Sequence, residues 1–387
     1  MRKGVCLAAG GSLLAATIGL FGGAAVADAS TGSQVVGYTY VNDNTATANT
    51  IAGFDRHADG SLTPIPGSPF TIGGAGLGAG LGSQGAIQVT QDGRFLLAVD
   101  AGSNQVSVLR VTAGGVPVQV GQPVSSGGVE PVSVAISPDG LVYVANSDAG
   151  GSDGNFTGFR LGFGGRLTPV PGSTVAAPAG SGPADVLFNA TGTRLVGTLV
   201  DTSQIDSFVV LPNGRLFAAP GSPFTAQGLG QIGAEFRPTN PSQLFVTNAH
   251  NGAGLGTVSA FRDGFLGQLT SIGSSPYADF QTAPCWVEIS HDGRFLFTVN
   301  TGSGTISRYS IASSGALTLL GSTTVGATGG VGAVDARLSP GGGFLYVDES
   351  RIGAVGEFAV SGGNLAELTG SPVSLPAGAA PAGIVVT

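Results

Sequence analysis

A pattern about 50 residues long recurs along this chain and restricts its possible folds more than any other feature. Its clearest copies are Gln91–Asp100 (QDGRFLLAVD) and His291–Asn300 (HDGRFLFTVN). In six copies the first aligned apolar residues lie 47 to 53 residues apart; they are Phe95, Val142, Leu195, Leu244, Phe295 and Phe344. Repeats of this length are typical of β-propellers, in which each repeat forms one blade that buries its faces against its neighbours.

Each copy predicts four short antiparallel strands. An apolar first strand, such as 132–136, is followed by a turn of the Ser-Pro-Asp-Gly type and a second strand. A third strand, such as 305–311, alternates apolar and polar residues. A fourth begins with Gly-x-Leu-Thr and ends with Gly-Ser-Pro, as in 60–69. The 68 glycines of the chain punctuate these apolar runs, which indicates turns between strands rather than disorder.

The chain ends on PAGIVVT (381–387), which aligns with PVSVAIS (131–137), the first strand of a complete copy. Six first strands occur elsewhere, whereas the opening segment 34–70 has strands two, three and four but no first strand. We therefore predict an all-β, seven-bladed β-propeller over residues 34–387, with four antiparallel strands per blade. Its first blade is closed by the C-terminal strand, which removes an exposed sheet edge.

Residues 1–27 have the pattern of a secretion signal. Arg2 and Lys3 are basic, 7–21 is apolar, and Ala25-Val26-Ala27 provides a small-x-small cleavage site. A single membrane anchor is the alternative, but the apolar segment is weakly hydrophobic and a cleavage site follows it. We therefore predict a signal peptide over 1–27, a short linker over 28–33, and a secreted, extracellular protein with no membrane span after cleavage.

Composition excludes some partners. The chain has 15 basic and 23 acidic residues, and signal cleavage would remove two basic residues and no acidic one. An acidic surface without basic clusters argues against binding to nucleic acid or anionic membranes. Cys285 would be the only cysteine left, so no disulfide within the chain is expected. We expect a monomer whose partner is a small-molecule ligand or a cell-surface component.

The repeat S/T-x-D-G-R-F-L-x-x-V-N, with the interleaved G-x-L-T-x-x-P-G-S-P-F, resembles the lactonase-type seven-bladed propellers. That family includes 6-phosphogluconolactonase-like proteins and carboxymuconate cycloisomerases, and the resemblance extends over residues 34–387. It implies that a ligand site lies at one mouth of the central channel, which the first strands line. The motifs encode strands and turns, so they indicate the fold more strongly than the activity.

The resemblance also implies an Arg and a His at the entry of the first strands, and this sequence lacks both. The positions that correspond to the His contain Ala86, Ser133, Asp185, Gly233, Trp286, Asp335 and Gly383. The preceding ring has no Arg. The family's acid–base chemistry is therefore not implied by matching residues. The Gly-rich segment 73–85 is interpreted as a flexible connection between blades.

The ends of the second strands carry a carboxylate or an amide in every blade, with Asp201 in the fourth. The other six are predicted metal ligands: Asn42, Asp100, Asn146, Asn248, Asn300 and Glu349. A crown of such oxygens at the channel mouth could hold a hard cation such as Ca²⁺, the one cofactor that the sequence suggests. In the alternative, these side chains bond their own backbone at the strand ends.

Four side chains are candidates for catalysis at this mouth. His250 is a possible general base because its ordinary pKa is near neutrality. Glu349 and Asp201 are possible orienting or metal-binding carboxylates, and Arg351 is a possible oxyanion partner. The only tryptophan, Trp286, either stacks on a ring-shaped ligand or fills the channel as core.

Two functions remain open from the sequence. The first is an enzyme that hydrolyses a lactone or catalyses the reverse cycloisomerisation, with the four candidates above in the roles given. The second is a secreted, non-catalytic binding or scaffold propeller, with or without stabilising calcium. A His, carboxylate and Arg clustered beside a pocket would favour the enzyme, whereas a channel filled by Trp286 and apolar side chains would favour the scaffold.

Overall fold

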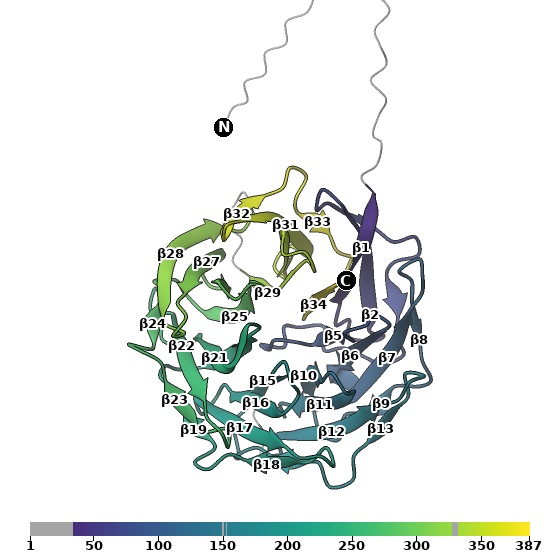
Figure 1. Ribbon diagram of the computed structural model, residues 1–387. Helices are drawn as coiled ribbons and strands as arrows, with labels where there is room; N and C mark the ends of the chain where they lie inside the picture. Colours follow the sequence, from purple (N-terminus) through teal and green to yellow (C-terminus); the bar gives the residue numbers. More distant parts are fainter. Residues whose placement is uncertain (1–33, 149–150, 152, 327–331) are drawn as a thin grey trace, which may run out of the picture. The chain divides into compact units, whose positions relative to one another are not determined.

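The computed structural model describes residues 34–148, 151, 153–326 and 332–387. The predicted signal peptide and linker, residues 1–33, lie outside the described residues. Within the compact unit Gln34–Thr387, the described strands form seven antiparallel sheets arranged as a ring (Figure 1). Each sheet contains a path of four strands, so the predicted seven-bladed β-propeller is confirmed.

The innermost strand of each blade lines the centre of the ring. From blade one to blade seven these strands are β34 (Ile384–Val386), β5 (Ile87–Val89), β10 (Pro131–Ile136), β15 (Pro183–Phe188), β20 (Gln231–Arg237), β25 (Pro284–Ile289) and β29 (Ala333–Leu338). Each of them contacts the inner strand of the next blade, and β29 contacts β34, so the ring is closed.

The second and third strands extend each blade outward. The second strands are β1 (Val35–Asn42), β6 (Phe95–Asp100), β11 (Leu141–Asn146), β16 (Arg194–Leu199), β21 (Asn240–Asn248), β26 (Phe295–Asn300) and β30 (Phe344–Glu349). The third strands are β2 (Thr50–His57), β7 (Gln105–Val111), β12 (Asn155–Leu161), β17 (Gln204–Val210), β22 (Thr257–Asp263), β27 (Thr305–Ile311) and β31 (Ala354–Ser361).

The outer edges are shorter and broken. One half of each third strand pairs with β3 (Leu62–Pro64), β8 (Pro117–Gln119), β13 (Leu167–Pro169), β18 (Leu216–Ala218), β23 (Leu269–Ser271), β28 (Leu317–Thr324) or β32 (Asn364–Glu367). In every blade except blade six, the other half of the third strand pairs with a second short strand. These strands are β4 (Phe70–Thr71), β9 (Val124–Ser125), β14 (Val175–Ala176), β19 (Phe224–Thr225), β24 (Tyr277–Ala278) and β33 (Val373–Ser374). A short 3-10 helix, η1 (Ala101–Ser103), follows β6.

The first blade is built from both ends of the described chain. Strand β34 pairs antiparallel with β1, with Thr39 opposite Val386 and Val41 opposite Ile384. The C-terminus therefore lies at the inner edge of this blade (Figure 1). This closure confirms the prediction made from the alignment of PAGIVVT with complete first strands.

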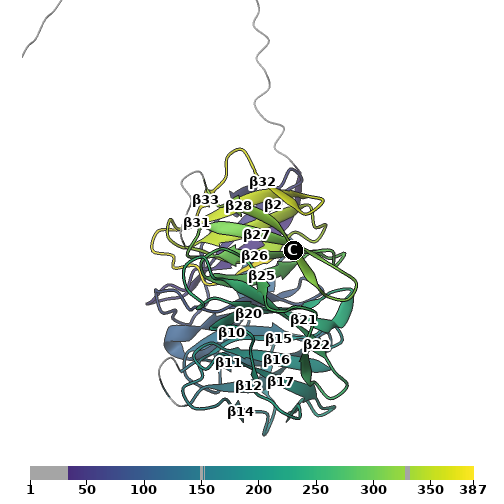
Figure 2. The same ribbon diagram turned by 90° about the vertical axis from the view of Figure 1, so that its left-hand side faces the viewer.

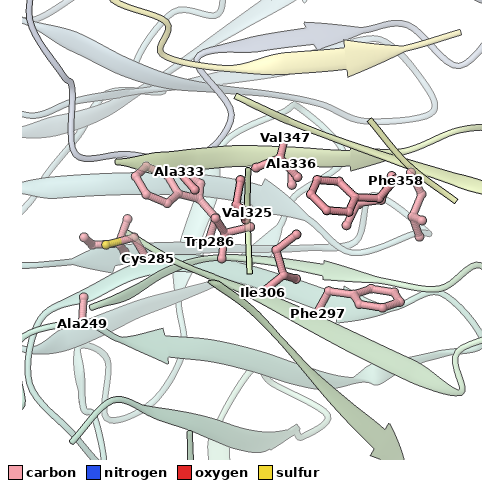
Figure 3. Close-up of a cluster of buried hydrophobic side chains, with 14 residues drawn as sticks. Ala249, Cys285, Trp286, Phe297, Ile306, Val325, Ala333, Ala336, Val347 and Phe358 are labelled. Carbon is pink, nitrogen blue, oxygen red and sulfur yellow. The ribbon is translucent and has the colours of Figure 1, made fainter. Parts of the chain in front are cut away.

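Apolar side chains on both faces of the blades form the core. The cluster between blades six and seven, for example, brings Phe297 and Ile306 against Val347 and Phe358 (Figure 3). The blades lie side by side around the ring (Figure 1), and the second view shows the same propeller from its edge (Figure 2). None of the described residues forms a helix with the length and apolar character needed to cross a membrane.

The repeated glycine at the start of the fourth strand has a packing role. Gly165 has φ 84°, and a Cβ there would come within 2.5 Å of the ring of Phe95 in the preceding blade. Gly363 and Phe295 repeat this contact at the same distance. Both the positive φ and the close aromatic ring favour glycine. The repeat motif therefore encodes contacts between blades as well as turns.

Candidate functional site

The inner strands bring five charged side chains together in the channel. They come from four consecutive blades and form what we call the channel cluster: Asp185 of β15, Glu235 of β20, Glu288 of β25, and Asp335 and Arg337 of β29. Successive side chains of a strand point to opposite faces, so Asp335 and Arg337, two residues apart, share a face. Four carboxyl groups thus surround one guanidinium.

Backbone N–H groups and one hydroxyl hold the two aspartates of the cluster. Asp185 accepts hydrogen bonds from the Ser133 hydroxyl at 3.1 Å and from the Ala234 N–H at 3.0 Å. Asp335 accepts two, from the Ala336 N–H at 2.9 Å and from the Gly85 N–H at 3.4 Å. Donors from four blades therefore fix the direction of these carboxyl groups.

The two glutamates of the cluster differ in their partners. Glu288 forms an ion pair with Arg337, with 2.8 Å between Oε2 and Nη1, and its Oε1 accepts a bond from the Leu338 N–H at 3.0 Å. Oε2 of Glu235 is buried and has no hydrogen-bond partner in the described part of the chain. Glu235 is thus the cluster member with spare capacity to accept a proton or a hydrogen bond.

Burial shifts the proton equilibria of the cluster. It raises the pKa of Asp185 to about 8 and that of Asp335 to about 6. Burial, followed by the charge of Glu288, raises the pKa of Glu235 well above its ordinary value. Burial by itself would lower the pKa of Arg337, but Asp335, Glu288 and Glu235 outweigh it and raise that pKa. The site therefore holds protonated carboxyl groups near neutral pH beside a fixed positive charge.

A cavity of about 300 Å³ gives access to this cluster. Its polar lining includes Gln84, Gln88, Asp185, Glu235 and Arg337, and we call it the channel pocket. Apolar residues at the ends of β15 and β20 line the rest: Leu187, Phe188, Ala190, Phe236 and Pro238. A small cavity with an apolar wall and a few converging polar groups is typical of a small-molecule site.

Opposite the apolar end of the channel pocket, near the starts of the inner strands, a plug occupies part of the channel. The Trp286 indole N–H donates to the Ser83 carbonyl oxygen at 2.7 Å, and Gln84 Oε1 accepts from the Val287 N–H at 3.0 Å. Ser83 and Gln84 are both buried. The end of segment 73–85 therefore crosses from blade two to blade six. The interpretation of this segment as a flexible connection was wrong for its last residues, because side-chain and backbone bonds anchor them.

Trp286 belongs to this plug. Only 6% of the residue is exposed, and it packs in the cluster between blades six and seven (Figure 3). Cys285 is also buried, and burial raises the pKa of its thiol to about 11, which disfavours the reactive thiolate. Of the two roles considered for Trp286, the structure supports packing, since the burial leaves no open face for a stacked ligand.

The structure does not bring the four catalytic candidates together. Asp201, His250 and Arg351 are exposed and follow the second strands of blades four, five and seven. Each lies against the glycine that precedes the first strand of its own blade, Gly182, Gly230 and Gly332 respectively. Glu349 is buried, and burial raises its pKa to about 7. No ion pair among the described residues joins any two of these four.

Four of the six predicted metal ligands bond the third strand of their own blade instead of pointing toward a common centre. Asn248 donates to the hydroxyls of Thr257 and Ser259 on β22, at 2.8 and 2.9 Å. Corresponding partners in the third strand serve three others: Asp100 bonds Ser107, Asn146 bonds Asn155, and Asn300 bonds Thr305 and Ser307.

The remaining two ligands of the predicted crown face different neighbours. Asn42 donates to the Val99 carbonyl oxygen of blade two at 3.0 Å. Glu349 lies beside Gly356 of its own blade, and its Oε1 has no partner in the described chain. Across the residues that the structure describes, no group of three or more His, Cys, Asp or Glu is placed to hold a metal ion. The bonds that are present agree with the alternative of strand-end capping.

Two regions of the chain, residues 46–161 and 237–381, match the family described as "Lactonase, 7-bladed beta-propeller". Together they make up more than half of the sequence. The chain belongs to this lactonase family. No curated protein sequence matches it. The resemblance of the repeat to lactonase-type propellers is thus confirmed at the level of the family.

Solved structures support the fold of this lactonase-family chain. A candidate 6-phosphogluconolactonase from Bacteroides uniformis has a TM-score of 0.73 at 18% identity, over 92% of this chain and 100% of that one. The periplasmic gluconolactonase of Pseudomonas aeruginosa has a TM-score of 0.72 at 18% identity, over 90% and 98%. At such low identity the likeness establishes the shared architecture alone.

The sequence motifs did not predict Glu235, Glu288 and Arg337. Asp185 and Asp335 belong to the ring that corresponds to the family's His, whereas these three residues belong to the next channel-facing ring, two residues further along each strand. A usable signal was present, because Glu288 and Arg337 interrupt apolar inner strands. A charged residue inside such a strand indicates a buried pair or a site.

Proposed function

We propose that this chain is a secreted hydrolase of uncharged lactones and that its active site is the channel pocket. The observation that carries the proposal is the unpartnered Oε2 of Glu235 in a cavity that Arg337 also lines. Ester hydrolysis needs a base for water and a positive group for the developing oxyanion. Membership of the lactonase family supports this reaction class.

In the proposed reaction, the ionised form of Glu235 accepts a proton from water while the water oxygen attacks the lactone carbonyl carbon. Because burial raises the pKa of Glu235, this form becomes more abundant as pH rises, and kcat should rise with it. Arg337 uses Nη1 for Glu288, and its remaining N–H groups supply donors for the oxyanion. The ring C–O bond then breaks, and the leaving oxygen takes a proton from Asp185, whose raised pKa of about 8 keeps it protonated at neutral pH. The product is a hydroxy acid, and a proton passes from Glu235 back to Asp185 through solvent.

The charge of the pocket supports an uncharged substrate. Four carboxyl groups surround Arg337, and one of them, Glu288, already pairs with it. A phosphate group carries up to two negative charges and needs cationic partners. A phosphorylated sugar lactone would thus meet net repulsion here. The signal-like residues 1–27 and the few basic side chains agree with an extracellular, unphosphorylated substrate.

The test is acid release, followed by pH-stat, from a panel of unphosphorylated five- and six-membered lactones and from a phosphorylated sugar lactone. We expect turnover of at least one unphosphorylated lactone, and a loss of about 100-fold or more in kcat for Glu235→Gln. Glu367→Gln, on the exposed strand β32, is the matched control and should leave kcat unchanged. Binding of a lactone without turnover would instead favour the non-catalytic binding propeller, the alternative that the packed Trp286 supports.

A further inference from the structure

A second group of buried carboxylates lies where the ring closes, between blades seven and one. Val41 and Ile384 of blade one pack there against Tyr346 and Val355 of blade seven. Because side chains alternate along a strand, Asp43 shares the face of Val41, and Asp348 shares the face of Tyr346. Both aspartates therefore face the junction between the first and last blades.

The carboxylate oxygens at this junction lack donors. Asp348 is fully buried, and within the described residues neither of its oxygens has a hydrogen-bond partner. Asp43 is also fully buried; its Oδ2 accepts a bond from the Thr50 hydroxyl at 2.7 Å, while Oδ1 has no partner. Buried polar atoms are nearly always bonded, so three unpartnered oxygens in one place call for a ligand.

No basic side chain of the described residues compensates these carboxyl groups. None of the ion pairs in the described chain includes Asp43 or Asp348. Burial, followed by the charges of Asp335 and Asp43, raises the pKa of Asp348 well above its ordinary value, and burial raises that of Asp43 to about 7. Without a ligand these carboxyl groups therefore tend to hold protons near neutral pH, and a bound cation would stabilise their ionised forms.

We propose that Asp43 and Asp348 hold a hard cation such as Ca²⁺ between the first and last blades. Their unpartnered oxygens are the ligand type that Ca²⁺ prefers, and water or main-chain carbonyl oxygens complete its shell. Two carboxylates suffice for this arrangement, which agrees with the lack of any larger His, Cys, Asp or Glu group among the described residues. The cation would stabilise the closed ring by linking the first blade to the last.

This site differs by one residue from the crown that the sequence suggested. Asn42 and Glu349 were the predicted ligands, and their sequence neighbours Asp43 and Asp348 point to the opposite faces of the same blades. Asn42 bonds Val99 in blade two, away from blade seven. Neither Asp43 nor Asp348 lines the channel pocket, so the two proposals can fail independently.

The test uses the full protein after dialysis against EDTA, with Ca²⁺ as the only probe. We expect elemental analysis to give about one bound Ca²⁺ per chain, and a melting temperature about 4 °C higher in 1 mM Ca²⁺ than in EDTA. Asp348→Asn and Asp43→Asn should each weaken Ca²⁺ binding at least tenfold and reduce the shift. Asp206→Asn, which removes a buried carboxylate in blade four, is the control and should leave Ca²⁺ binding and the melting-temperature shift unchanged.

Two results would overturn the proposal. One is a wild-type protein that binds no Ca²⁺ and melts at the same temperature in both buffers; this result needs no variant to fold. The other is Ca²⁺ binding that survives unchanged in both Asp43→Asn and Asp348→Asn, because the ion would then lie elsewhere. Lactone turnover measured in the same samples separates this outcome from a failure of the catalytic proposal.

Discussion

The channel cluster and the ring of second-strand ends are both polar and both buried, yet their side chains are directed differently. Asn248 bonds the third strand of its own blade and so acts within one sheet. Glu235, Glu288 and Arg337 point from three blades into one shared space. Polar residues of the first kind support the blade, whereas those of the second kind can meet a ligand. Direction, more than residue type, distinguishes the two regions.

The largest expected effect tests whether the channel cluster depends on its single cation. Arg337→Met should destabilise the protein by about 3–5 kcal/mol, because it leaves Glu288 and its neighbours buried without a positive partner. Urea unfolding gives the change. Arg160→Met, which removes an exposed ion pair with Asp139, is the control and should cost no more than about 1 kcal/mol. Equal costs for the two variants would contradict the distinction.

The second prediction concerns the ring of strand ends. Asn248→Ala should cost about 2–3 kcal/mol because it removes bonds to Gln231, Thr257 and Ser259 inside the blade. The kcat for lactone hydrolysis should be unchanged. Asn213→Ala, in an exposed turn, is the control and should change stability by less than about 1 kcal/mol. Loss of activity with full stability would place Asn248 in the site and remove the contrast between the regions.

The third prediction uses pH to compare buried carboxyl groups with exposed ones. The pKa of Asp185 is raised to about 8 and that of Asp335 to about 6, so the folded state holds protons that the unfolded chain has released above about pH 4. Stability should therefore fall as pH rises from 5 toward 8, by at least about 2 °C in melting temperature.

Exposed aspartates act in the opposite direction. The pKa of Asp292 is lowered to about 2, first by the Ser290 hydroxyl, so its contribution is present above about pH 4 and is lost as pH falls toward 2. Calorimetry should therefore find maximal stability near pH 4 to 5. Asp185→Asn should flatten the decline on the alkaline side. Stability that rises between pH 5 and 8 would contradict the raised pKa values in the channel cluster.

Local sequence was sufficient to predict the blades. Alternating apolar residues and turn glycines act over a few neighbours, and the regular spacing of the copies predicted how many sheets would form. Even the closure of the ring was visible, since 381–387 repeats the first-strand pattern that 34–70 lacks. Because these signals are local or periodic, they can be recognised in the sequence without knowledge of any tertiary contact.

The site depended on contacts between distant segments. Ser83 and Trp286 are separated by 203 residues, and no local pattern indicates that they meet and fill one part of the channel. The same holds for Glu288 and Arg337, whose pairing requires two neighbouring blades to be in register. His250, Asp201 and Arg351 were predicted from their chemistry and their positions after second strands, but each side chain lies against a glycine of its own blade.

The sequence by itself determined the family, the number of blades and the strand that closes the ring, because these follow from repeated local patterns. Only the tertiary structure decided which polar side chains converge. One residue along a strand separates Asn42 from Asp43 and Glu349 from Asp348, and the alternation of side chains sends them to opposite faces. A shift of one position is small in sequence, but in a ring of blades it changes which blade a side chain meets.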